Sequence, residues 1–134
     1  MALEQDLGLD LSMTASTAGG ALEQYGIVRS TAADTIALCT SSINDVNRGM
    51  GILQNDPASG QAATVRWLGK SKCVAGGTIN IGDLVTSTTV GRALAAGTTG
   101  QSVIGTANSA TTAAGQLFDV FLGIGGRAFV GSTS

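Results

Sequence analysis

The fold is indicated by the stretch Gly76-Gly77-Thr78-Ile79 and the run Leu84-Val85-Thr86-Ser87-Thr88 that follows it, because an earlier part of the chain has the same pattern. Gly19-Gly20-Ala21-Leu22 precedes Ile27-Val28-Arg29-Ser30-Thr31, and the two copies are 57 positions apart. A glycine pair and a strand-like run therefore return together. Self-similarity at a fixed spacing indicates two copies of one supersecondary unit.

The match continues along both copies, with small changes of spacing that fall in predicted loops. Matched pairs are Ile36-Ala37-Leu38 with Arg92-Ala93-Leu94, Met50-Gly51 with Ile104-Gly105, Gly60-Gln61 with Gly115-Gln116, Val65 with Val120, Lys72 with Arg127, and Gly76 with Gly131. The alternative is a chance resemblance between two segments rich in Gly, Ala and Thr. Duplication is favoured because the matched positions follow the same order along both segments. We predict halves at about 19–76 and 77–131, packed around a pseudo-twofold axis and a shared core.

Alternation of apolar and polar residues within each half is typical of β-strands. Ala63, Val65 and Trp67 alternate with the polar residues Thr64 and Arg66. Phe118, Val120 and Leu122 alternate with Asp119 and with Phe121, which is an apolar exception. We expect the core to include Val65, Trp67, Val120 and Leu122. The other predicted strands are 27–31, 35–40, 50–54, 72–75, 84–88, 103–107 and 127–130.

The fold class that follows is all-β, a compact β-barrel or sandwich built from two pseudo-symmetric halves. Its short strands are separated by Gly, Asn-Asp-Pro and Ser/Thr clusters, which are typical of small barrels and sandwiches. Only 41–48 resembles a helix, of one or two turns, with Ser42 as its cap. Residues 19–134 form the single β domain, and residues 1–18 form an extended N-terminal arm outside the repeat.

The arm has an alternating pattern of its own, with leucines at odd positions and Glu4, Asp6, Asp10 and Ser12 at even positions. One reading is that this apolar strand adds to the sheet edge of a neighbouring protein. The other is that it forms the first strand of its own barrel. Under the first reading, the candidate partner-binding residues are Leu3, Leu7, Leu9 and Leu11.

The composition argues for a surface that contacts other protein. Charged residues make up 12% of the chain, against about 25% in a typical domain. The seven basic residues are scattered and the formal charge is -2, so the sequence lacks the basic stripe of a nucleic-acid-binding protein. No apolar run approaches the ~20 residues of a membrane span, and no secretory signal is present. We therefore expect a soluble chain with Cys39 and Cys73 as free, core-like thiols.

The sequence offers no enzyme chemistry. It contains no histidine, which excludes Ser-His-Asp and Cys-His catalysis and imidazole metal sites. Two isolated cysteines do not make a zinc site. Two segments resemble phosphate-binding motifs, Gly69-Lys70-Ser71 and Gly123-Ile124-Gly125-Gly126, but neither is followed by the predicted helix that such motifs require. The aspartates lie in turn-like settings, so we expect no catalytic residue, no cofactor and no metal.

The segment Gly76-Gly77-Thr78-Ile79-Asn80-Ile81-Gly82-Asp83-Leu84-Val85 resembles the small capsid cement, or head decoration, proteins of tailed bacteriophages. Two later segments, Ser102-Val103-Ile104-Gly105-Thr106-Ala107 and Gly115-Gln116-Leu117-Phe118-Asp119-Val120, resemble strands of the same family. This resemblance covers roughly residues 20–123 and implies a β domain, without catalytic residues, on the outer surface of an assembled phage head. The implied partners are the major capsid protein and further copies of the chain, a trimer rather than a dimer. Synthesis would take place in the host cytoplasm.

Three other functions remain open at this point. A tail or fibre component is close to the cement function. A carbohydrate-binding or adhesin-like module would need exposed aromatic residues, of which the chain has few. A lipoyl-like carrier domain would need a modifiable lysine at a hairpin tip, and Lys70 and Lys72 lack the flanking recognition pair.

Overall fold

The longest strand, β5 (Ala62–Val74), runs through both halves of the molecule and joins them. The computed structural model describes residues 8–18, 20–40, 51–97, 101–122 and 128–129. All regular structure in these residues is β, which confirms the predicted fold class. The described residues contain no helix that could span a membrane. The short helix expected at 41–48 lies outside them.

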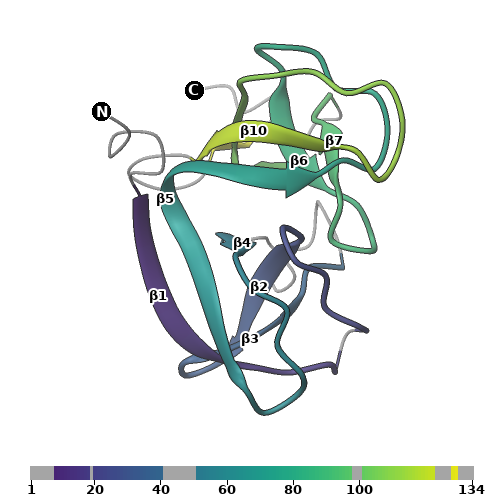
Figure 1. Cartoon of the computed structure of the whole chain (residues 1–134). Helices are drawn as coiled ribbons and strands as arrows, with labels where there is room; N and C mark the ends of the chain where they lie inside the picture. Colours follow the sequence, from purple (N-terminus) through teal and green to yellow (C-terminus); the bar gives the residue numbers. More distant parts are fainter. Residues whose placement is uncertain (1–7, 19, 41–50, 98–100, 123–127, 130–134) are drawn as a thin grey trace.

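The first half is a closed barrel, drawn in the lower part of Figure 1. Its strands follow the order β1 (Gly8–Ala15), β3 (Thr35–Leu38), β2 (Ile27–Ala32), β4 (Gly51–Leu53) and the first part of β5. The ring closes because β1 pairs with β3 on one side and with β5 on the other. A closed barrel leaves no continuous open edge along its sheet.

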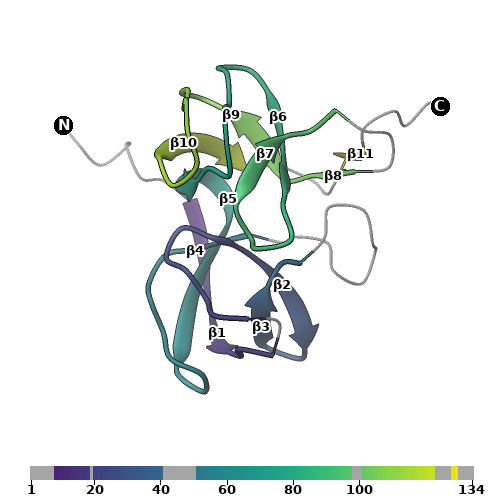
Figure 2. The same cartoon turned by 90° about the vertical axis from the view of Figure 1, so that its right-hand side faces the viewer.

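The second half is a barrel of the same kind, above the first in Figures 1 and 2. It contains the last part of β5, then β10 (Leu117–Leu122), β9 (Gly105–Ala107), β6 (Leu84–Ser87) and β7 (Ala93–Ala95). A parallel bridge between Ala75 and Ala93 closes this ring. A separate two-stranded sheet pairs β8 (Ser102–Val103) with β11 (Ala128–Phe129).

The two barrels share one pattern of pairing, so the sequence repeat is also a structural repeat. One sequence match is wrong by one position, because Val28 pairs with Leu38 as Val85 pairs with Ala95, so Leu38 corresponds to Ala95 and not to Leu94. Val28 pairs with Gly51 as Val85 pairs with Gly105, and Leu53 pairs with Val65 as Ala107 pairs with Val120. Backbone hydrogen bonds repeat as well. The Leu53 N–H donates to Gly26 O at 3.0 Å, and the Ala107 N–H donates to Asp83 O at 2.8 Å.

The repeat begins earlier in the chain than the glycine pair. Gly60 N–H donates to Ala15 O at 2.8 Å, and its counterpart Gly115 N–H donates to Ala75 O at the same distance. Strand β1 therefore holds the place in the first barrel that residues 68–75 hold in the second. For residues 8–15 the structure has the second reading of the N-terminal pattern, the first strand of its own barrel. Strand β5 ends one unit and begins the next.

Two apolar clusters fill the molecule. The smaller cluster lies in the first barrel and includes Val28, Leu53 and Val65. The larger cluster joins the second barrel to the first and includes Val120 and Leu122. Three of the four predicted core residues, Val65, Val120 and Leu122, are indeed buried.

Trp67 is the exception, because 39% of it is exposed. The prediction that it is a core residue is wrong for a local reason. Leu9 pairs with Leu68 and Asp10 pairs with Arg66, so Trp67 is the extra residue of a β-bulge and faces no partner. A bulge bends its strand, and β5 turns at this point from one barrel into the other (Figure 1).

Both cysteines are buried free thiols, as predicted. Cys39 and Cys73 belong to the larger cluster. Burial, with a smaller contribution from the charge of Glu23, raises the pKa of the Cys73 thiol far above its ordinary range. A thiol held neutral in this way is a poor nucleophile and metal ligand, so Cys73 acts as a small apolar side chain.

Candidate partner-binding surface

The arm residues that the structure describes are exposed apolar side chains on β1. Leu9 is 50% exposed and Leu11 is 44% exposed. Both alternate with Asp10, so they lie on the opposite side of the strand from its carboxylate. Leu3 and Leu7, the other two candidates, lie outside the described residues.

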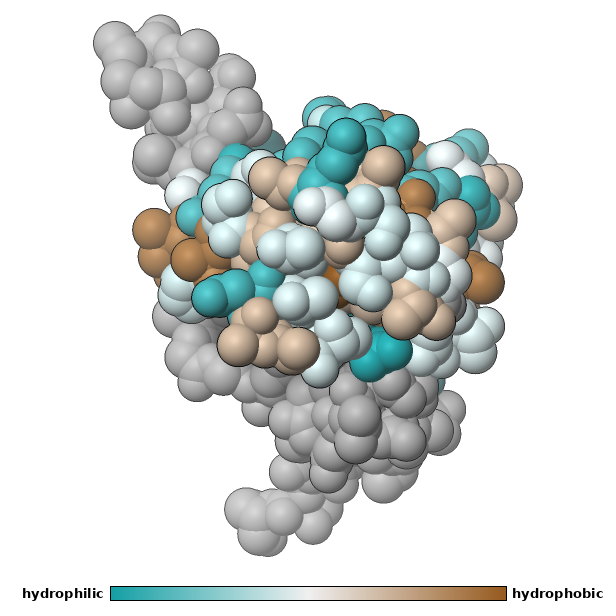
Figure 3. All heavy atoms as spheres, turned by 90° about the horizontal axis from the view of Figure 1, so that it is seen from below, coloured by the Kyte–Doolittle hydropathy of each residue, from teal (hydrophilic) through white to brown (hydrophobic). Residues whose placement is uncertain are grey.

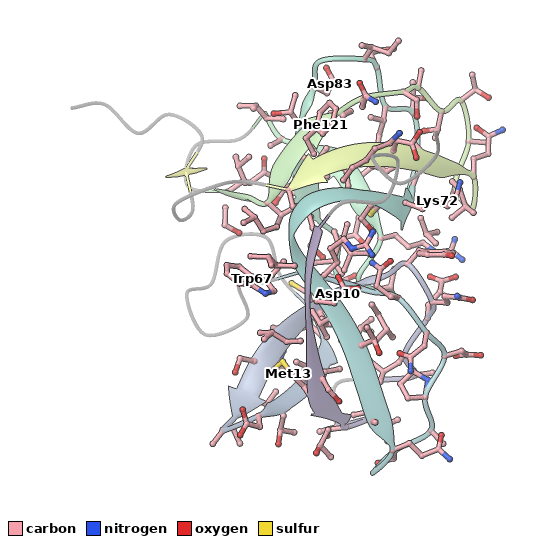
Figure 4. The ribbon with its side chains drawn as sticks, turned by 60° about the vertical axis from the view of Figure 1, so that its left-hand side comes forward. Asp10, Met13, Trp67, Lys72, Asp83 and Phe121 are labelled. Atoms are coloured by element: carbon pink, nitrogen blue, oxygen red, sulfur yellow. The ribbon has the colours of Figure 1, made fainter. Side chains whose placement is uncertain are left out.

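Trp67 adds an aromatic side chain next to these leucines. It sits at the bulge where β5 passes Leu9 and Asp10, and Figure 4 shows its ring and the Asp10 side chain on opposite sides of the strand pair. We name Leu9, Leu11 and Trp67 the open-end surface, because they lie where the interior of the first barrel reaches solvent. Met13, further along β1, packs on the smaller cluster.

The polar side of β1 is held by one well-formed ion pair. Arg66 Nε donates to Asp10 Oδ1 at 2.7 Å, and Arg66 Nη2 donates to Asp10 Oδ2 at 3.1 Å. Arg66 Nη1 also donates to Lys70 O at 2.9 Å. A guanidinium that binds both β1 and the chain beyond the bulge fixes the bend of β5 and therefore the direction of Trp67.

A groove of about 730 Å³ separates the two barrels on another side. Leu22 and Leu38 line it from the first barrel and Val90 from the second. At its rim, Arg92 Nη2 donates to Glu23 Oε2 at 2.9 Å. This hydrogen bond, together with the charge of Glu23, raises the pKa of Arg92. The groove therefore combines apolar side chains with the ion pair of Glu23 and Arg92.

The second barrel also exposes large apolar side chains. Ile81 and Leu84 project near the start of β6, and Leu117 and Phe121 are exposed on β10.

Viewed from below, apolar residues gather on the side where β1 lies in Figure 1, and much of the remaining coloured surface is weakly polar (Figure 3). Across the described ranges, no group of three or more acidic or thiol side chains could hold a metal ion.

Sequence reasoning identified Leu9 and Leu11 but missed Trp67, Ile81 and Leu84 as surface residues. The alternation that exposes the leucines is visible in the letters. The bulge that exposes Trp67 is not, because it depends on how β1 aligns with β5. Leu84 has the same pattern as its buried counterpart Ile27, so the letters alone do not distinguish them.

Comparison with known proteins gives a likeness in structure and none in sequence. No protein-family model and no curated protein matches this sequence. The fold is similar to a solved structure described as the head fiber gp8.5 N base in bacteriophage phi29, with a TM-score of 0.61. The two chains share 20% identity, and the match covers 87% of this chain and 95% of that chain. At this identity the likeness establishes a shared fold over nearly the whole of both chains.

Proposed function

We propose that this protein is a structural component of a bacteriophage virion that binds the outer surface of the assembled head. The observation that carries the proposal is the likeness to the base of a phage head fibre over 87% of the chain. A sequence without histidine and a surface with exposed leucines support a role in contact rather than in catalysis.

Within that role, we propose the function of a capsid cement protein. It would bind across junctions between major capsid subunits as a homo-oligomer, preferably a trimer, with Leu3, Leu7, Leu9 and Leu11 as partner contacts. A protein that binds only the assembled shell stabilises that shell by linkage. Many identical sites on one shell multiply weak contacts, so partly exposed leucines suffice.

The second candidate is the base of a head fibre, which the description of the structural neighbour favours. The two candidates differ in what lies beyond the bound protein. A cement protein covers junctions between capsid subunits across the whole shell. A fibre base carries further mass that projects outward.

The test is to mix the purified protein with phage heads that lack it and to image them by electron microscopy. Density over subunit junctions, together with a higher disruption temperature of the heads, is the expected result. Projecting density at the bound sites would favour the fibre base. Heads that neither bind the protein nor gain stability would reject the virion role.

The arm is tested by removing residues 1–7 alone. Strand β1 begins at Gly8 and Met13 packs in the first barrel, so a longer deletion would also open that barrel. We expect the shortened protein to keep its circular dichroism spectrum and to bind heads more weakly. Unchanged binding would exclude Leu3 and Leu7 from the capsid contact.

A further inference from the structure

The contact between the two barrels shows how one barrel closes the other. Ile27, Cys39 and Ile52 come from strands of the first barrel or from the residue that follows one, yet they are buried in the larger cluster with Cys73 and Phe118. The outer face of the first barrel therefore plugs the open end of the second.

Backbone and side-chain hydrogen bonds fix this plug. The Val74 N–H donates to Tyr25 O at 3.0 Å, and the Ile27 N–H donates to Gly91 O at 2.7 Å. Gln54 Nε2 lies 2.9 Å from Ser71 Oγ. The segment from Tyr25 to Ile27 thus lies between two parts of the second barrel.

Because the chain is a repeat, the plugging face has a counterpart on the second barrel. Leu84 corresponds to Ile27 in the matched pairings of β2 and β6. Ile81 corresponds to Gln24 at the same spacing of 57 positions, and the Tyr25 and Gly82 N–H groups that follow them make matched hydrogen bonds to Leu53 O and Ala107 O. Among the residues that the structure describes, no further barrel covers this counterpart. Ile81 is 72% exposed and Leu84 is 46% exposed. We name these two residues the plug surface.

The plugged end likewise has a counterpart on the first barrel, and it is the open-end surface. Leu11 corresponds to Ser71, because Leu11 pairs with Val65 as Ser71 pairs with Val120. Trp67 corresponds to Leu122 at the spacing of 55 positions that also relates Val65 to Val120. Ser71 and Leu122 are buried, whereas Leu11 and Trp67 are exposed. Within the described part of the chain, the counterparts of both sides of the internal contact are therefore exposed, one on each barrel.

We propose that the plug surface of one copy docks on the open-end surface of the next copy. The contact would repeat between molecules the packing that joins the barrels within one molecule. It deepens the homo-oligomer of the proposed function by naming its contact. Because the two surfaces differ, the contact is head-to-tail and closes into a ring if the rotation allows, which agrees with a trimer better than with a symmetric dimer.

One hydrogen bond prevents the contact between two molecules from reproducing the contact between the two barrels in full. The Thr14 N–H donates directly to Asp34 O at 2.7 Å. Their counterparts, Val74 and Gly91, are instead bridged by the Tyr25–Ile27 segment. The first barrel therefore has no gap between Thr14 and Asp34 that a backbone segment of a second copy could enter. Side chains alone would hold the second copy. The free surfaces are suited to this, since Ile81 replaces Gln24 and Leu11 replaces Ser71.

The test measures association of the full chain by sedimentation velocity over a range of concentrations. Two variants, Ile81→Gln and Leu11→Ser, give each position the residue of its counterpart in the other half. Each should raise the dissociation constant at least tenfold and leave the thermal midpoint unchanged. Leu117→Gln is the matched control, because Leu117 is exposed and belongs neither to the two surfaces nor to the groove.

Mixing the two variants distinguishes head-to-tail contact from a symmetric one. In an equimolar mixture, the intact plug surface of Leu11→Ser meets the intact open-end surface of Ile81→Gln. We expect dimers in the mixture that neither variant forms alone. A wild-type chain that stays monomeric, variants that associate as the wild type does, or a mixture without dimers would each overturn the proposal. Binding of a monomeric chain to phage heads would do so while leaving the proposed function intact.

Discussion

Gly51 and Gly105 hold the same place in the two barrels, and each lets its strand approach a neighbour too closely for a side chain. A Cβ on Gly51 would lie 2.6 Å from Arg66 O and 2.8 Å from Val65 Cγ1. A Cβ on Gly105 would meet the carbonyl oxygen of Phe121 at a still shorter separation. We predict that alanine at either position destabilises the fold.

The magnitude follows from the displacement that alanine demands. Carbon and oxygen atoms in contact normally lie about 3.3 Å apart or more, so β4 would have to move about 0.7 Å from a backbone oxygen that cannot rotate away. Overpacking of this kind costs about 1–3 kcal/mol. Loss of unfolded-state entropy returns roughly 0.4–1 kcal/mol. We expect Gly51→Ala to lose about 1–2 kcal/mol of unfolding free energy, and Gly105→Ala to lose more.

Thermal unfolding followed by circular dichroism measures the effect. A loss of 2 kcal/mol lowers Tm by roughly 8 °C in a domain of this size. Gly97→Ala is the control, because no heavy atom lies within 4 Å of its added Cβ, and its Tm should change little. If both test variants melt at the same temperature as Gly97→Ala, the close approach at Gly51 and Gly105 does not constrain the two barrels.

Three further predictions concern the interior. Ile27 is fully buried in the larger cluster, so Ile27→Ala should cost about 2–5 kcal/mol, with Trp67 fluorescence and circular dichroism still reporting one transition; two separate transitions would show that the barrels unfold independently. The Thr86 hydroxyl is the buried side-chain oxygen without a hydrogen bond among the described residues, so Thr86→Val should raise stability by about 1 kcal/mol in urea unfolding, and a loss would indicate a hidden partner. Burial raises the pKa of Cys73, whereas an unfolded thiol titrates near about 8.5. The unfolded chain therefore releases a proton that the folded chain keeps, and stability should fall as pH rises past that value; Cys73→Ala should show a smaller fall, and equal falls would contradict the assignment.

The parts of the fold that could be predicted from sequence are those that side chains encode directly. Glycine pairs and alternating strands recur in order, and the barrels superpose in pairing as a result. Strand β1 was harder to place because its register is set by backbone hydrogen bonds. Residues 8–15 and 68–75 do the same work in the two barrels, yet only Ala15 and Ala75 are identical.

On the candidate surface, too, the exposure of some residues follows from the alternation in the sequence, and the exposure of others depends on strand pairing and packing. Leu9 and Leu11 are exposed on a strand whose alternation predicted an apolar edge. Trp67 continues the alternation of Ala63 and Val65, yet it is exposed because it is the unpaired residue of the bulge where β5 leaves the first barrel. Ile27 and Leu84 are equivalent residues with opposite burial, because the first has another barrel beside it and the second does not. Exposure of an apolar residue on this face of the unit therefore depends on whether another unit packs beside it.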